Sequence, residues 1–174
     1  MFMDPLETLG AVHLQSTNTV ADFGAGSGFV SYAAAGLVPQ GQVFAIEIKK
    51  DQVTRITRDA DDRKLTNLHA LWGDIEINEG TKLANESVDV VLCFNVLFLL
   101  DDKASMLKEA FRVLKTGGKI AVVDWTESFG GMGPQPHHVF NQTMAETLLT
   151  TVGFKKLADA LPAGAHHYGI LFGK

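Results

Sequence analysis

The stretch Val20-Ala21-Asp22-Phe23-Gly24-Ala25-Gly26-Ser27-Gly28 decides the fold predicted for this chain. The apolar run from Thr19 to Phe23 is typical of a buried strand, and a loop with three glycines follows it. Glycines in such a loop allow positive φ angles and let a ligand approach the backbone closely. Residues 27–37 then place apolar side chains at helical spacing, and the start of a helix offers free N–H groups. The stretch therefore predicts a strand, a turn and a helix, with the turn serving either as a ligand-binding loop or only as a tight connection.

Outward from this stretch, short apolar runs alternate with longer amphipathic segments. Such alternation is typical of βαβ units, so the predicted fold class is a doubly wound α/β fold with a parallel sheet. A turn at 162–164 joins the last two strands and is too short for a helical crossover, so one terminal strand should run antiparallel to the rest. We expect Gly117 and Gly153 just past the ends of the helices that precede them. The expected strands are 19–23, 41–48, 68–72, 88–94, 119–125, 154–160 and 166–172, and the expected helices are 4–14, 27–37, 51–64, 101–115 and 137–152.

Length and composition are those of an ordinary globular chain. Its 174 residues correspond to about one domain, and 46% are hydrophobic against 20% charged. The formal net charge of −5 and the lack of a basic run argue against nucleic acid and against a membrane surface as partners. The single cysteine, Cys93, excludes an intramolecular disulfide and a thiolate metal cluster, and we expect no metal. No signal peptide is readable at Met1–Leu9, and the apolar run 90–100 is too short to span a bilayer, so we expect a cytoplasmic protein.

Two acidic residues stand at the ends of the next two strands, where doubly wound sheets bind their ligands. Glu47 ends the second strand, 19 residues after Gly28, and an acid at that place can accept hydrogen bonds from ribose hydroxyls. Asp74 follows the third strand, where it could accept a hydrogen bond from an exocyclic amine while Ile75 covers a base. The alternatives are a surface glutamate and a loop-capping aspartate.

The glycine spacing argues against a phosphate ligand. A dinucleotide fingerprint has its third glycine one position later, where this chain has Phe29, which disfavours a nicotinamide-dependent dehydrogenase. A phosphate-cradling loop has a Lys followed by Ser or Thr, and neither follows Gly28. Together the three strand ends suit an adenosine that carries something other than a phosphate.

In this order and spacing the motifs resemble those of the class I S-adenosylmethionine-dependent methyltransferases. Within that class the chain is most similar to the small-molecule group that includes the ubiquinone/menaquinone C-methyltransferases (methyltransferase type 11). The resemblance implies a Rossmann-like seven-stranded sheet of order 3-2-1-4-5-7-6 with strand 7 antiparallel. It also implies one domain over residues 1–174, with a short N-terminal helix at 4–14 and no separate cap domain. The matching stretches are Val20–Gly28, Val43–Glu47, Gly73-Asp74, Ser87–Leu97 and Leu107–Lys119.

The same resemblance implies the cofactor, S-adenosyl-L-methionine, and the residues that hold it. Asp22 would lie under the cofactor amino group, and residues 24–28 would lie along its methionine part. Glu47 would hold the ribose, and Asp74 would hold one edge of the adenine. The full set of expected cofactor residues is Asp22, Gly24, Ala25, Gly26, Ser27, Gly28, Glu47, Ile48, Gly73, Asp74, Ile75, Phe94 and Asn95.

No catalytic residue stands out from the sequence. A sulfonium is already activated, so alignment and exclusion of water can supply most of the catalysis, and a base is needed only if the acceptor loses a proton. The candidates for that base are His137, His138 and Glu127, which can equally be polar loop residues. We expect His166 and His167 to lie on a strand face far from the cleft. Asp124 is expected near the cleft. The side chains of Trp125, Phe129 and Met132 either wall an apolar acceptor site or pack the loop onto the sheet. Cys93 is expected to be a small buried residue.

The leading functional hypothesis is methylation of a small-molecule acceptor at carbon or oxygen. The alternatives are a protein or RNA methyltransferase, with the net charge arguing against RNA, and a module that binds the cofactor with little catalysis. Arsenite-type methylation needs several thiols, which one cysteine does not supply. Only residues before Thr19 and from Trp125 to His138 remain for acceptor recognition. We therefore expect a site open on one side, unless a second copy of the chain, in a homodimer, or another partner closes it.

Overall fold

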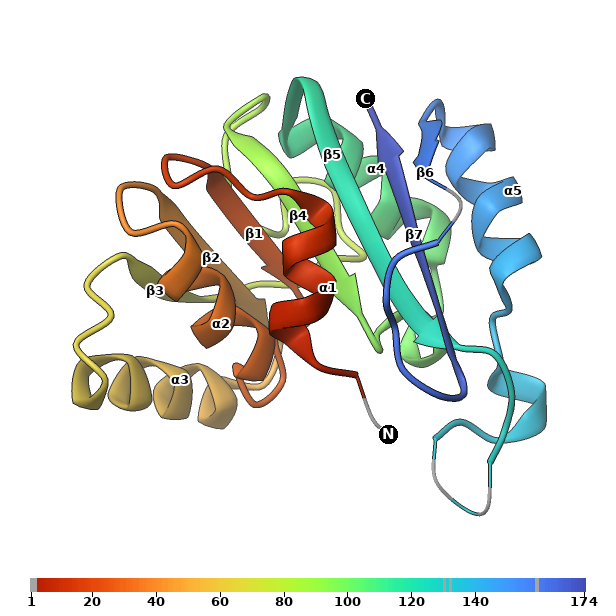
Figure 1. The fold of residues 1–174 in the computed structure, drawn as a ribbon, viewed down its shortest axis with the longest axis horizontal. Helices are drawn as coiled ribbons and strands as arrows, with labels where there is room; N and C mark the ends of the chain where they lie inside the picture. Colours follow the sequence, from red (N-terminus) through yellow and green to blue (C-terminus); the bar gives the residue numbers. More distant parts are fainter. Residues whose placement is uncertain (1–2, 130, 132, 159) are drawn as a thin grey trace.

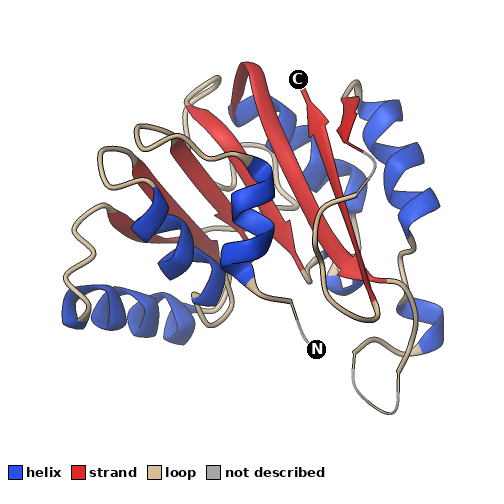
Figure 2. Cartoon of the chain, in the orientation of Figure 1, coloured by secondary structure: helices blue, strands red, loops and turns tan. Residues whose placement is uncertain are grey.

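The computed structural model describes residues 3–129, 131, 133–158 and 160–174, and these form a seven-stranded sheet with helices on both faces (Figures 1 and 2). The strand order is β3-β2-β1-β4-β5-β7-β6, as predicted. The strands are β1 (Thr19–Phe23), β2 (Gln42–Glu47), β3 (Leu68–Trp72), β4 (Val88–Phe94), β5 (Leu114–Trp125), β6 (Lys155–Ala158) and β7 (His167–Gly173). The helices are α1 (Pro5–Val12), α2 (Phe29–Leu37), α3 (Lys50–Asp62), α4 (Lys103–Val113) and α5 (Gln142–Val152), with short 3-10 turns η1 (Leu97–Leu99) and η2 (Pro136–His138).

The pairing of the strands confirms the predicted fold class. Strands β1 to β5 pair in parallel, and β7 runs antiparallel to both β5 and β6. Helices α1, α2 and α3 bury apolar residues against one face of the sheet, whereas α4 and α5 cover the other (Figure 2). Because β4 is covered on both faces, its sequence is an almost continuous apolar run.

Local capping decides where the helices begin. The Asp102 carboxylate accepts a hydrogen bond from the Ser105 backbone N–H, and α4 starts at the following residue, Lys103. The Asn141 side chain likewise caps α5 by accepting from the Met144 N–H. Gly153, with φ of 119°, ends α5 as predicted, because that left-handed region favours glycine.

Two predicted helices have different limits in the structure. The helix predicted over 101–115 ends at Val113, and Leu114 already pairs with Val88 in the sheet. The prediction that Gly117 ends this helix is therefore wrong, because Gly117 lies inside β5. The helix predicted over 137–152 is also too long, since α5 begins only after its cap at Asn141 and residues 136–138 form the separate turn η2.

The direction of β7 changes where two histidines lie. Parallel strands β1 to β5 all finish at one edge of the sheet, but antiparallel β7 begins there, with His167 paired to Trp125 at the end of β5 (Figure 1). His166 and His167, which were expected on a strand face far from the cleft, therefore lie at the edge of the sheet where the parallel strands end. Among the described residues, no helix has both the length and the apolar character needed to cross a membrane.

Candidate functional site

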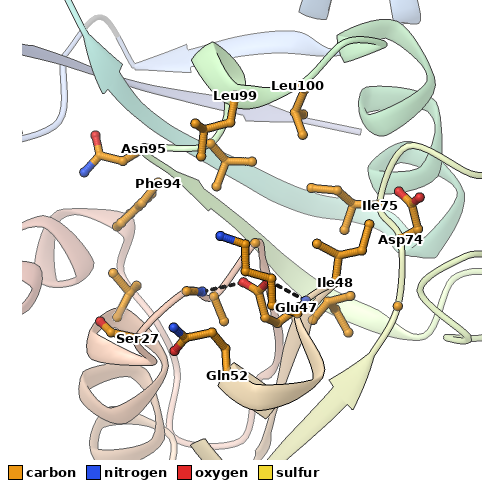
Figure 3. A pocket seen from close by; sticks show the side chains of 18 of the residues that line it. Ser27, Glu47, Ile48, Gln52, Asp74, Ile75, Phe94, Asn95, Leu99 and Leu100 are labelled. Atoms are coloured by element: carbon orange, nitrogen blue, oxygen red, sulfur yellow. Dashed lines mark hydrogen bonds between the residues drawn. The ribbon is translucent and has the colours of Figure 1, made fainter. Parts of the chain in front are cut away.

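A pocket of about 620 Å³ opens at the edge where β1, β2, β3 and β4 end (Figure 3). Its volume falls in the range typical of small-molecule and cofactor sites, roughly 300–1,000 Å³. Eleven of the thirteen cofactor residues predicted from the sequence line it. These eleven are Gly24, Ala25, Gly26, Ser27, Glu47, Ile48, Gly73, Asp74, Ile75, Phe94 and Asn95.

Glu47 ties the end of β2 to the glycine-rich loop. Its Oε2 accepts a hydrogen bond from the Gly26 N–H at 2.9 Å, and its Oε1 accepts from the Lys49 N–H at 2.9 Å (Figure 3). The side chain is almost fully buried, with 7% of its surface exposed. An ionised carboxylate has about four acceptor positions, so two remain for a ligand that carries hydroxyl groups.

Asp74 is held at the end of β3 by its own turn. Its Oδ1 accepts from the Glu76 N–H at 2.9 Å, as in an Asx turn. Among the described residues, no hydrogen bond engages its second carboxylate oxygen, Oδ2. The side chain therefore has both roles weighed from the sequence, since one oxygen caps the loop and the other stays available at the pocket.

Two amide oxygens in the pocket lack partners. Gln52 Oε1 and Asn95 Oδ1 are both buried, and neither has a hydrogen-bond partner in the described part of the chain. Gln52 comes from α3 and Asn95 follows β4, so they reach the pocket from different walls (Figure 3). Asn95 adopts a left-handed backbone conformation with φ of 57°, which asparagine tolerates better than most residues. Buried polar atoms are nearly always paired, so these two oxygens indicate that a ligand with N–H or O–H groups completes the site.

Asp22 and Gly28 do not line the pocket but support it from behind. The buried Asp22 carboxylate accepts a hydrogen bond from Ser31 Oγ at 2.5 Å, and burial raises its pKa to about 6, with nearby Glu47 adding to the rise. Gly28 has φ of 81°, and a Cβ there would lie 2.7 Å from the Tyr32 ring. Only glycine fits this position, because it has no side chain to clash with α2.

Several residues that line the pocket were not predicted from the sequence. Phe29 and Leu99 stand at the pocket with 58% and 68% of their surfaces exposed, although both are large and apolar. Phe29 occupies the position where a dinucleotide fingerprint has glycine, and that departure could have marked it. Gln52 had no signal, because a polar residue on a polar helix is usually solvated. The full set of missed residues is Met3, Phe29, Val30, Ile46, Lys49, Gln52, Glu76, Val96, Leu99 and Leu100.

The candidate bases do not line the pocket. Glu127 pairs with the His166 ring, at 2.7 Å between Oε1 and Nδ1. His137 and His138 are exposed in η2, with their rings 4.1 Å apart. The Phe129 ring stacks on the His166 ring, with 3.6 Å between the ring centroids. Met132 lies outside the described residues.

Asp124 and Cys93 are buried on the α4–α5 side of the sheet. Asp124 Oδ1 accepts from the Trp125 N–H, whereas its buried Oδ2 has no partner in the described structure. Burial raises the pKa of Asp124 to about 6. Burial also raises the pKa of the Cys93 thiol, with Asp124 and Asp22 adding to the rise, so this cysteine stays protonated.

The chain is similar to several proteins described as methyltransferases. A family model described as a methyltransferase domain matches residues 14–158. A ubiquinone biosynthesis O-methyltransferase from Xanthomonas euvesicatoria is 28% identical over 179 residues, covering 94% of this chain and 64% of that protein. A human arsenite methyltransferase is 34% identical over 112 residues, covering 60% of this chain and 30% of that protein. The crystal structure of an S-adenosylmethionine-dependent methyltransferase from Aquifex aeolicus superimposes with a TM-score of 0.89 at 23% identity, over 98% of this chain and 89% of that one.

The fold and the pocket at its strand ends define a Rossmann-like S-adenosylmethionine-dependent methyltransferase domain. The chain belongs to the methyltransferase domain family, as its motifs predicted, and the cofactor of that family is S-adenosylmethionine. The chain spans about 64% of the length of the Xanthomonas ubiquinone biosynthesis O-methyltransferases that it matches.

Proposed function

We propose that this chain transfers a methyl group from S-adenosylmethionine to an uncharged small molecule, at oxygen or carbon. The observation that carries the proposal is a division of the pocket into two walls. The wall formed by β4 and η1 has no charged side chain and ends in the exposed Leu99. An uncharged acceptor would meet no unpaired charge on that wall. The charged residues that line the pocket lie at or just after the ends of β2 and β3, and they are Glu47, Lys49, Asp74 and Glu76.

The residues present fit the cofactor. Its ribose hydroxyls would donate to the free positions of the Glu47 carboxylate, and its adenine amine would donate to Asp74. The unpartnered oxygens of Gln52 and Asn95 would accept from its remaining N–H or O–H groups. When bound, S-adenosylmethionine supplies a methyl group that is already activated by a positively charged sulfur. The chain would then have to align the acceptor with that methyl group and exclude water.

The named relatives bear on the acceptor atom. Relatives described as ubiquinone biosynthesis O-methyltransferases match nearly the whole chain, which favours an oxygen acceptor on a small molecule. Relatives described as arsenite methyltransferases match a shorter part. Arsenite chemistry is disfavoured because the single cysteine of this chain is buried in β4 and has a raised pKa.

A two-stage experiment tests the proposal. In the first stage, S-adenosylmethionine, S-adenosylhomocysteine and NAD are compared for their effect on the melting temperature. We expect only the two adenosyl sulfur compounds to raise it, by an amount equivalent to about 2.7 kcal/mol at a hundredfold excess over Kd. In the second stage, transfer of a tritiated methyl group is measured to simple phenols, to a mixture of proteins and to RNA. Transfer to protein or RNA, with none to phenols, would show that the acceptor is a macromolecule.

A further inference from the structure

His167, the first residue of β7, has a buried ring nitrogen without a partner. Its Nδ1 lies 2.9 Å from the carbonyl oxygen of Ala165, which can only accept. This contact assigns the proton of the neutral ring to Nδ1 and leaves the lone pair on Nε2. Nε2 is buried, and no group among the described residues hydrogen-bonds to it. An unpaired buried acceptor is rare in a folded protein, so its presence points to a donor supplied by a ligand.

His167 faces the same side of the sheet as the apolar wall of the cofactor pocket. Phe94, which lines the pocket, pairs with Val123, and both belong to the core cluster on the side of α1 and α2. Trp125 lies two residues beyond Val123 on the same strand, so its side chain points to the same face. Trp125 in turn pairs with His167, and side chains of paired residues share a face. The side chains of Phe94, Val123, Trp125 and His167 therefore form a continuous stripe on one face of the sheet.

The geometry of the sheet gives the length of this stripe. His167 is two strands away from Phe94 and two residues further along, which corresponds to about 12 Å between the Cα atoms. Both side chains are long and project from the same face. The side chains of Val123 and Trp125, on the intervening strand β5, lie between them on this face, so an acceptor that reaches both the pocket and His167 would lie over these two side chains.

The imidazole ring is held in place. Trp125 packs against it with 4.1 Å between the ring centroids and 41° between the planes. The loop after β5 supports Trp125 in turn, since a Cβ on Gly133 would lie 2.7 Å from the indole ring. The Ala165 carbonyl fixes the other side of the imidazole. The orientation of the imidazole ring, and with it the direction of Nε2, is therefore fixed before a ligand binds.

The other candidate groups at this edge are less suited to the role. The Glu127 carboxylate is engaged by His166, and His137 and His138 stand exposed in η2. Asp124 is one residue from Trp125, so its side chain points to the opposite face, where it lies with Tyr168.

We propose that His167 is a catalytic residue whose Nε2 binds the hydroxyl group of a phenol-type acceptor and takes its proton during methylation. The inference rests on the proposed function and adds to it the acceptor class and the base. As the new bond forms between the acceptor oxygen and the methyl carbon, the bond from that carbon to sulfur breaks and its electron pair stays on sulfur. The hydroxyl proton moves to Nε2, which leaves a neutral methyl ether and an imidazolium that later releases its proton to water.

Two substitutions separate the two ring nitrogens. His167→Asn keeps a donor near the position of Nδ1 but removes Nε2, whereas His167→Gln places an amide near the position of Nε2. With the protein saturated by S-adenosylhomocysteine, we expect His167→Asn to weaken catechol binding by about tenfold, the effect of losing about 1.4 kcal/mol. His167→Gln should bind catechol nearly as well as the unsubstituted protein but should not take up the proton, so methyl transfer should fall in kcat. The matched control is His69→Asn, since His69 lies on the distant strand β3, where its ring bonds Gln42 of β2.

A measurement on the unsubstituted protein protects the test against misfolded variants. In the 15N spectrum of the histidine side chains, the Nε2 resonance of His167 should shift and saturate as catechol is added. An Nε2 resonance that stays unchanged, or a His167→Asn variant that binds catechol normally, would overturn the proposal. Calorimetry with S-adenosylmethionine distinguishes failure of the His167 proposal from failure of the proposed function. If the cofactor binds but the catechol experiments fail, only the role of His167 is overturned. If the cofactor does not bind, the proposed function is overturned.

Discussion

The Glu47 carboxylate at the end of β2 accepts a hydrogen bond from the Gly26 backbone N–H at 2.9 Å, within the pocket at the strand ends. One side chain therefore holds the glycine-rich loop and still offers acceptor positions to a ligand. Two parts of the site that are distant in sequence depend on the same carboxylate. The adenosine subsite and the methionine subsite would consequently be coupled through Glu47.

Replacement of Glu47 tests this coupling. We expect Glu47→Ala to weaken S-adenosylmethionine binding by about 1–3 kcal/mol, because a charged acceptor is lost from a buried position. Isothermal titration calorimetry measures the effect, and Asp51→Asn, at an exposed acid in the first turn of α3, is the control. Unchanged affinity in Glu47→Ala would remove Glu47 from the site.

Gln52→Leu should have opposite effects on stability and on binding. Its Oε1 is buried without a partner, so an apolar side chain of similar size should leave the free protein as stable or make it more stable, by up to about 1 kcal/mol. Cofactor affinity should fall by about 0.5–1.5 kcal/mol through loss of a hydrogen bond. Thermal melts without ligand and calorimetric titrations give the two values. Gln40→Leu, at an exposed site, should change neither, and a Gln52→Leu variant that binds normally would contradict the assignment.

Leu99→Ser tests the apolar wall of the pocket. Leu99 is 68% exposed, so the free energy of unfolding should change by less than about 0.5 kcal/mol. Cofactor affinity should also stay the same, whereas KM for a phenolic acceptor should rise. Leu157→Ser, at an edge-strand residue that is 54% exposed, is the matched control. A KM that does not respond would place the acceptor elsewhere.

The raised pKa of Asp124 predicts how the stability of the protein depends on pH. Burial raises its pKa from 3.8 to about 6, so the folded protein holds this proton more tightly than the unfolded chain does. Its contribution to stability is therefore fully present below about pH 4 and is lost as the pH rises through about 6. In Asp124→Asn the free energy of unfolding should decrease less as the pH rises. This variant should be more stable than the unsubstituted protein at pH 7, by roughly 3 kcal/mol at most, with little difference at pH 4. Urea unfolding at several pH values measures it, and equal slopes for both proteins would refute it.

The Glu109–Arg112 pair should be important for stability. The Glu109 side chain is fully buried, accepts two hydrogen bonds from the Arg112 guanidinium, and also holds the Glu79 and Thr81 backbone of the loop after β3. Glu109→Gln should lower the free energy of unfolding by about 3–5 kcal/mol, because Arg112 loses its charged partner. Arg58→Gln removes an exposed pair with Asp59 and should cost less than about 1 kcal/mol. Similar decreases in the free energy of unfolding of the two variants would show that the buried network adds little to stability.

Much of the architecture could be predicted from local sequence. Alternating apolar runs and amphipathic segments predicted the sheet and its helices, and the short 162–164 turn predicted that the last two strands pair antiparallel. Glu47 and Asp74 could be placed at the pocket because parallel strands deliver their carboxyl ends to one edge. The helix ends at 113 and 142 could not be predicted as well, because strand pairing of Leu114 and the cap at Asn141 compete with helical periodicity.

The sequence by itself determined the order of the elements and the strand ends that meet at the pocket, because periodicity and turn chemistry are local properties. Only the tertiary structure decided which side chains reach the pocket. It turned Asp22 toward Ser31, directed Gln52 into the cavity and brought the start of antiparallel β7, with His167, to the edge where the parallel strands end. These placements depend on contacts between residues that are distant along the chain, and no local pattern encodes the direction of a side chain across such a contact.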